Sequence, residues 1–151
     1  MALCLVALTL QVFLPVYFPL VGMLDLPLLA VVYLALLRQN VLVGMTIGLL
    51  VGLGQDGLTH GPIGLFGIIK SVIGYSAAAV SLVIEVGYPG ARGVLAALFF
   101  LAHQVMFWAL EGALLGGAAT LDPALTLILA ATHAGLALLL FRALDSLRPR
   151  A

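Results

Sequence analysis

The sequence predicts an all-α integral membrane protein, built as a single bundle of six transmembrane helices. Hydrophobic residues make up 64% of the 151 residues and charged residues only 8%, and the mean hydropathy is +1.29. A soluble domain of ordinary composition carries about 25% charged residues, so nearly all of this chain is expected to lie in the bilayer. In addition, proline, glycine and aspartate divide the chain into six apolar segments.

The first three segments are bounded by residues that start or stop helices. Pro15 and Pro19 mark the end of the first segment, because proline does not continue a helix. Asp25 is a favoured N-cap residue and Pro27 suits a first turn, so a second helix is expected to begin there. This second segment is only about 18 Å long, which leaves open whether it spans the membrane by itself. Arg38 separates it from the third segment.

Turn signals likewise separate the last three segments. The sequence GPIG at residues 61–64 is typical of a sharp turn, and EVGYPGARG at residues 85–93 interrupts the helical pattern again. Gly116 closes the fifth segment, and Asp122 followed by Pro123 opens the sixth. The predicted helices cover residues 2–20, 26–37, 41–55, 63–84, 94–115 and 123–141, and residues 142–151 are expected to form a short cytoplasmic tail.

The charges in the connections orient the predicted bundle. With six crossings every arginine falls on one side of the membrane, which the positive-inside rule assigns to the cytoplasm. Five crossings would divide the arginines between the two sides. Both termini are therefore expected to be cytoplasmic. The arginines are Arg38, Arg92, Arg142, Arg148 and Arg150, and the opposite connections hold Asp25, Asp56 and Asp122.

Small residues recur at helical spacing on the third and fourth segments. Gly44, Gly48 and Gly52 lie four residues apart, and Asp56 continues their row. Such a row lets two helix backbones approach closely. We expect it to pack the third segment against the fourth within one subunit; a homodimer through the same ridge is the alternative. The facing row on the fourth segment is Gly67, Ser71, Gly74 and Ala78.

Two charged residues lie inside the apolar segments. Lys70 and Glu111 are each about 8 Å from the same predicted membrane surface, so they are expected to form a buried ion pair. Alternatively, Lys70 reaches outward to Asp56. Charged residues within a membrane are candidates for function as well as for structural pairing, and the structural pair is the favoured interpretation.

A second polar group is predicted near the middle of the membrane. Gln11, His103, Gln104 and His133 come from the first, fifth and sixth segments. They are compatible with a hydrogen-bonded core, a small-molecule pocket or a proton relay. We favour the hydrogen-bonded core, since buried polar groups in proteins are generally paired.

No motif in the sequence predicts catalysis. The H-E-x-x-H metalloprotease motif and the nucleotide-binding P-loop are both absent from the sequence. A single cysteine provides no zinc-ligand spacing. The formal net charge is zero, so no basic face is available for nucleic acid. The sequence therefore predicts a protein that is not an enzyme, without catalytic residues, cofactor, metal or nucleic-acid partner.

Two stretches of the sequence resemble the bacterial rod shape-determining MreD family. They are DLPLLAVVYLALLR at residues 25–38 and GLLVGLGQDGLTHGPIGLFGIIKSVIGY at residues 48–75, followed by a terminal apolar helix with an arginine tail. The resemblance covers essentially the whole chain. It implies a non-enzymatic protein of the bacterial inner membrane that acts in the cell-elongation machinery. Its implied partners are MreC, bound directly, and through it MreB, RodA and the transpeptidase PBP2.

The six-helix layout of this family also resembles the substrate-binding subunits of energy-coupling-factor vitamin transporters. That resemblance implies an alternative function, the binding of a vitamin or another small molecule in association with an ATPase module. In this alternative a cavity near the outer turns would be lined by Asp56, Lys70, Gln104 and Glu111.

Overall fold

The structure, a computed structural model, describes residues 2–17, 24–59, 64–84, 86–116 and 122–146. The described residues form six α-helices and no strand, in agreement with the predicted fold class. The helices are α1 (Ala2–Tyr17), α2 (Leu26–Arg38), α3 (Val41–Thr59), α4 (Leu65–Val83), α5 (Pro89–Leu115) and α6 (Pro123–Ser146).

Four of these helices, α3 to α6, are long and apolar enough to cross a membrane. The other two are shorter, with 16 residues in α1 and 13 in α2. At about 1.5 Å per residue α2 is about 20 Å long, less than the hydrocarbon thickness of about 30 Å. Among the described residues, length and composition thus allow four helices to cross a membrane, and α2 is too short to cross by itself.

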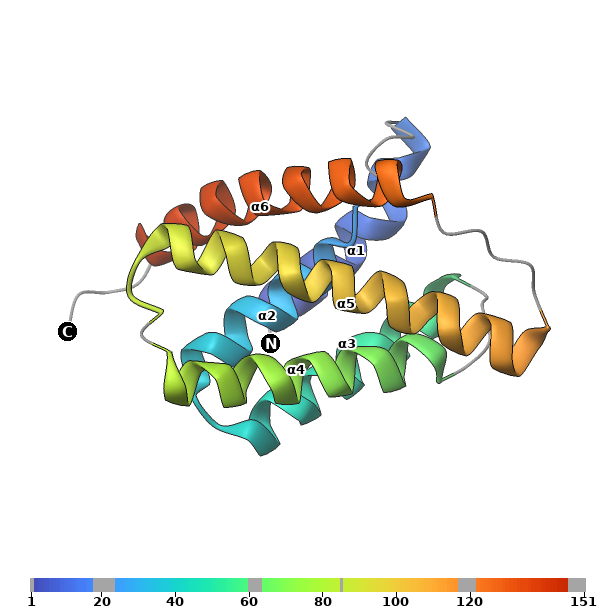
Figure 1. Cartoon of the computed structure of the whole chain (residues 1–151), viewed down its shortest axis with the longest axis horizontal. Coiled ribbons are helices and arrows are strands. Elements are labelled where there is room, and N and C mark those ends of the chain that lie inside the picture. The colour runs from blue at the N-terminus through green and yellow to red at the C-terminus, as the bar shows by residue number, and fades with distance from the viewer. Residues whose placement is uncertain (1, 18–23, 60–63, 85, 117–121, 147–151) are drawn as a thin grey trace.

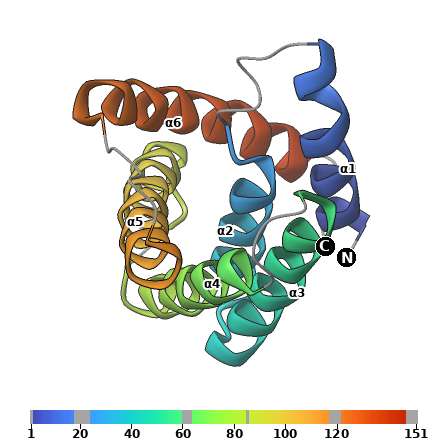
Figure 2. The same cartoon turned by 90° about the vertical axis from the view of Figure 1, so that its right-hand side faces the viewer.

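The short helix α2 lies in the centre of the bundle. Seen from one end, the other five helices surround it (Figure 2), and it contacts all of them. α2 begins partway along the bundle and runs to one end, whereas α3, α4 and α5 run along the length of the bundle (Figure 1). Residues on all sides of α2 are buried, from Pro27 to Tyr33 without interruption. A helix that is apolar on every face is expected to be buried inside a protein.

The glycine row packs α3 against α4 within the subunit. A Cβ atom added to Gly48 would overlap the backbone carbonyl of Lys70, and one added to Gly52 would overlap that of Phe66. A Cβ atom added to Gly44 would overlap the backbone oxygen of Gly74, and one added to Gly74 would overlap that of Gly44. This face of α3 is covered by α4, so the alternative of a homodimer through the ridge is wrong for this structure.

Three helices extend beyond their predicted bounds by four or five residues, whereas α2 gains only Arg38 and α4 is shorter than predicted. α3 continues past residue 55 to Thr59, so Asp56 lies on the helix and not in a turn. α5 begins at Pro89 instead of residue 94, because proline is tolerated in a first helical turn. α6 continues to Ser146, so residues 142–146 of the predicted tail are helical. The predicted helical residues 18–20 and 63 and the tail residues 147–151 lie outside the described residues.

The helix ends that carry arginines lie together at one end of the bundle. Arg92 at the start of α5 pairs with Asp145 at the end of α6, and Asp145 also accepts a hydrogen bond from the Tyr33 hydroxyl of α2. Gln39, next to Arg38, donates to the carbonyl of Ser81 near the end of α4. We call this the arginine end (Figure 1, left). A cavity of about 620 Å³ lies there, between the last turns of α2 and α4 and the segment that leads into α5.

Candidate functional site

The polar residues of the bundle gather where α2 begins. The first amide groups of a helix have no partner within the helix, and in a membrane they need partners from the protein itself. The Asp25 amide donates to His133 Nε2 at 3.2 Å, and the Leu26 amide donates to Gln11 Oε1 at 2.9 Å. Pro27 has no amide hydrogen, and the Leu28 amide donates to Asp25 Oδ1 at 2.9 Å. Every amide from residue 25 to residue 28 is thus accounted for.

The second carboxylate oxygen of Asp25 forms an ion pair with Lys70, whose side chain is fully buried. The Lys70 ammonium also lies 5.1 Å from the centre of the Phe66 ring. The predicted pairing of Lys70 with Glu111 or Asp56 is therefore wrong. Because α2 begins inside the bundle, Asp25 is buried beside Lys70 and does not lie in an exposed turn. Glu111 is half-buried on α5 and forms no ion pair with any described residue.

His133 has a structural role in this arrangement. It is fully buried on α6, and its ring stacks on Phe100 with centroids 3.9 Å apart. Its Nε2 accepts from the Asp25 amide, so the proton of the ring is assigned to Nδ1, which lies 3.2 Å from the Leu129 carbonyl. Neutral His133 thus links α6 to the start of α2.

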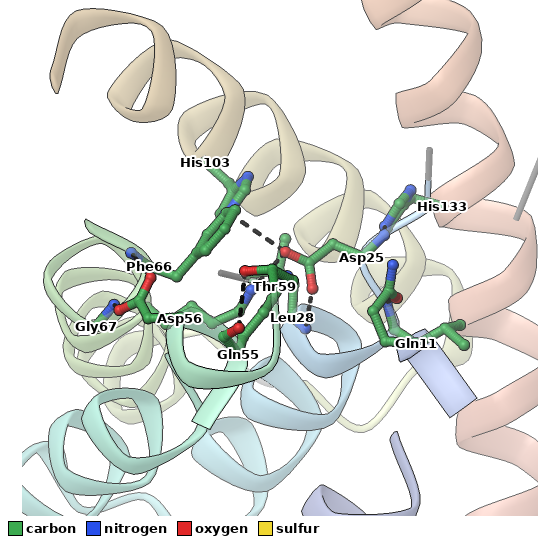
Figure 3. Close-up of polar contacts among 12 residues, drawn as sticks. Gln11, Asp25, Leu28, Gln55, Asp56, Thr59, Phe66, Gly67, His103 and His133 are labelled. Atoms are coloured by element: carbon green, nitrogen blue, oxygen red, sulfur yellow. Dashed lines mark hydrogen bonds and ion pairs between the residues drawn. The ribbon is translucent and has the colours of Figure 1, made fainter. Parts of the chain in front are cut away.

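His103 lies beside the same carboxylate, but its ring nitrogens form no hydrogen bond with any described residue. Its Nε2 lies 3.3 Å from Asp25 Oδ2 (Figure 3), without the alignment of a hydrogen bond. Neither ring nitrogen of His103 has a hydrogen-bond partner among the described residues, and the same holds for Gln55 Oε1. The ring of His103 stacks on Phe66 and Phe107. These unpaired atoms distinguish His103 from His133.

A cavity of about 150 Å³ adjoins the unpaired atoms. It lies among α1, α3, α4, α5 and the start of α2. Of the four residues predicted to line a cavity, only Gln104 does so. Lys70, Asp56 and Glu111 do not line it. Lys70 is paired with Asp25, and Asp56 accepts hydrogen bonds at the start of α4. The lining residues are Gln11, Leu24, Asp25, Gln55, Phe66, Phe100, His103, Gln104 and Phe107.

Asp56 serves as a buried cap for α4 and is only 1% exposed. Its carboxylate accepts hydrogen bonds from the amides of Gly64, Phe66 and Gly67 at 2.9 to 3.1 Å. A negative charge at the start of a helix is favourable both for these amides and for the helix dipole. Asp56 is thus not exposed in a turn, because its side chain is directed inward onto the start of α4.

Replacement of Asp56 by alanine is expected to lower the free energy of unfolding by about 2 kcal/mol, the upper range for loss of a helix cap. Three amides at the start of α4 lose their acceptor, and the side chain that supplies it is buried. Chemical denaturation of the purified protein in mild detergent would measure the loss. Asp122→Ala is the matched control, because Asp122 caps α6 but is exposed. Equal losses for the two variants would contradict the buried role of Asp56.

The sequence indicates His103, Gln104, His133 and Lys70 as buried polar residues, but it indicates Asp25 only as a helix start and does not indicate Gln55. The missing signal for Asp25 is the length of the second segment, which is too short to bring both its ends to the membrane surfaces. Gln55 lies one residue before Asp56, outside the row of small residues, and its orientation depends on how α3 packs. Among the described residues, no group of three His, Cys, Asp or Glu side chains is placed to hold a metal ion.

Comparisons of the chain with models of known protein families, with curated proteins and with solved structures find no match.

Proposed function

We propose that the protein is a non-enzymatic membrane scaffold of the bacterial cell-elongation complex. In this role it lies in the inner membrane with both termini in the cytoplasm and binds MreC directly. Through MreC it connects MreB to RodA and PBP2 in lateral peptidoglycan synthesis and the maintenance of cell shape. The choice of these partners rests on the resemblance of the sequence to the MreD family.

The observation that carries the proposal is the division between buried charged residues that have partners inside the bundle and an apolar exterior. Asp25 and Lys70 form an ion pair inside the bundle, and Asp56 accepts hydrogen bonds from amides at the start of α4. The outward faces carry large apolar side chains, such as Leu5 on α1, 66% exposed, and Leu139 on α6, 70% exposed. A surface of this kind suits lipid and the membrane helix of a partner.

The two stretches that carry the family resemblance form the central helix and most of the helix pair that packs against it. Residues 25–38 are the cap and helix of α2, and residues 48–75 are most of the α3–α4 pair that packs against it. The two stretches are therefore in contact with each other in the folded molecule. This supports a role in which a rigid core holds the outer helices in place for a partner.

Purification in mild detergent from native membranes, followed by mass spectrometry, tests the proposal. We expect recovery of MreC, a single-span protein, together with the wall synthases. A control membrane protein of similar size, purified in the same way, should not recover them. Recovery of ATPase subunits and a coupling subunit instead would overturn the scaffold and favour the transporter alternative.

Tryptophan substitutions on the outer helices are expected to identify the face that contacts MreC. Leu5→Trp with Phe13→Trp adds bulk to exposed positions of α1, and Leu127→Trp with Ile128→Trp does the same on α6. These changes are compatible with lipid but obstruct a packed helix. We expect one pair to reduce MreC recovery by about tenfold, equivalent to about 1.4 kcal/mol of binding free energy. Unchanged recovery with both pairs would argue against docking on α1 or α6.

A further inference from the structure

We infer that the cavity beside His103 and Gln55 binds a small, uncharged, flat molecule that carries a carboxamide or a similar donor–acceptor group. This inference concerns a ligand site inside the bundle and does not depend on the scaffold role or on MreC.

The unpaired atoms are the first observation that points to a ligand. Gln55 is 6% exposed and His103 is 4% exposed, and both line the cavity. Gln55 Oε1 and His103 Nδ1 lack hydrogen-bond partners among the described residues, and the neighbour of His103 Nε2 is the Asp25 carboxylate at 3.3 Å, without hydrogen-bond alignment. Buried polar atoms without partners destabilise a folded protein, so such atoms beside a cavity indicate a molecule that supplies the missing bonds.

The polar groups around the cavity come from three helices and are largely amides. Gln11 lies on α1, Gln55 on α3 and Gln104 on α5. A glutamine amide both donates and accepts hydrogen bonds. A carboxamide on the ligand is complementary to these groups, because it offers a donor and an acceptor side by side.

The charges of the site select an uncharged ligand. Asp25 is the one acidic residue of the lining, and its charge is balanced by Lys70 behind it. A further charge on the ligand would have no partner in a cavity whose other walls include phenylalanine rings, and burying an unpaired charge is costly.

The size and shape of the cavity select a small ring. The volume of about 150 Å³ is below the range of about 300–1,000 Å³ that is usual for sites of drug-sized ligands, so the cavity suits a small molecule. The rings of Phe66, His103 and Phe107 are nearly parallel, with interplanar angles of 5° to 19°. A flat ring packs well against one face of such a stack.

Nicotinamide and nicotinate form a suitable pair of probes, since they share a ring and differ in that nicotinate carries a negative charge. Binding would be measured by saturation-transfer NMR with the full chain in detergent. We expect saturable binding of nicotinamide at millimolar concentration and at least tenfold weaker binding of nicotinate. A cavity filled only by water would bind neither probe. Absence of saturable nicotinamide binding, or equal binding of both probes, would overturn the inference.

Two variants connect binding to the unpaired atoms. Gln55→Leu removes the orphaned amide, and His103→Phe keeps a stacked ring while removing both nitrogens. We expect each to weaken nicotinamide binding by at least tenfold and to leave the melting temperature unchanged or higher, because each removes an unsatisfied polar group. Thr132→Val on the exposed face of α6 is the control and should bind as the original chain does. Unchanged binding in both cavity variants, or failure of both to fold, would overturn the inference.

Discussion

Replacement of Lys70 by methionine is expected to lower the free energy of unfolding by about 3–5 kcal/mol, the range measured when one partner of a buried ion pair is removed. Methionine fills nearly the same space but leaves the Asp25 carboxylate buried without its cation. The start of α2 depends on that carboxylate, which also accepts from the Leu28 amide. The loss should therefore reach the whole bundle, because α2 contacts the other five helices. Denaturation of the purified protein in mild detergent is the measurement.

The double variant Asp25→Asn with Lys70→Met tests whether the lost stability comes from the unpaired charge. Asparagine keeps a side-chain oxygen to accept from the Leu28 amide but carries no charge, so the double variant should recover much of the loss. Glu111→Gln is the matched control and should change stability by less than about 0.5 kcal/mol, as expected away from buried networks. A large effect of Glu111→Gln together with a small effect of Lys70→Met would restore the pairing first predicted from the sequence.

Replacement of Gly48 by alanine is the second change expected to have a large effect, with a loss of more than about 3 kcal/mol, at or beyond the usual range for overpacking a core. The new methyl group would overlap the backbone carbonyl of Lys70. Backbone atoms have no alternative rotamer, so α3 and α4 would have to separate along the row of close contacts from Gly44 to Gly52. The free energy of unfolding and the yield of folded protein would both report the change.

Gly57→Ala is the control for this prediction, because Gly57 lies on the same helix and an added Cβ meets nothing within 4 Å. Alanine is the better helix former by about 0.5–1 kcal/mol, so this variant should be as stable as the original chain or more stable. If Gly48→Ala instead left the protein folded and only reduced the recovery of MreC, the glycine row would be an outer surface, contrary to the contact with α4.

Local patterns in the sequence are sufficient to predict the glycine contact. Gly44, Gly48 and Gly52 recur at the spacing of one helix face, and Gly67 and Gly74 lie on the neighbouring helix beyond a short turn. Two helices joined by a short turn pack against each other, so the contact follows from residues close together in the chain. The structure places these glycines at the α3–α4 contact.

The polar site was predictable only in its composition. His103, Gln104, His133 and Lys70 stand out because they interrupt apolar segments. The sequence does not predict their partners correctly, because the predicted depth of each residue assumes that every helix reaches both membrane surfaces. α2 does not conform to that assumption, and Asp25 is buried beside Lys70.

Composition, caps and glycine spacing are local properties, so the sequence alone predicts an apolar chain divided into six helices. The central position of α2 depends on the packing of five other helices around it and is therefore seen only in the folded molecule. The folded molecule also shows that Asp25, 45 residues from Lys70 in the chain, is the partner of that lysine. A buried charge pairs with whichever opposite charge the packing brings within reach, and that distance is set by the arrangement of the helices in space.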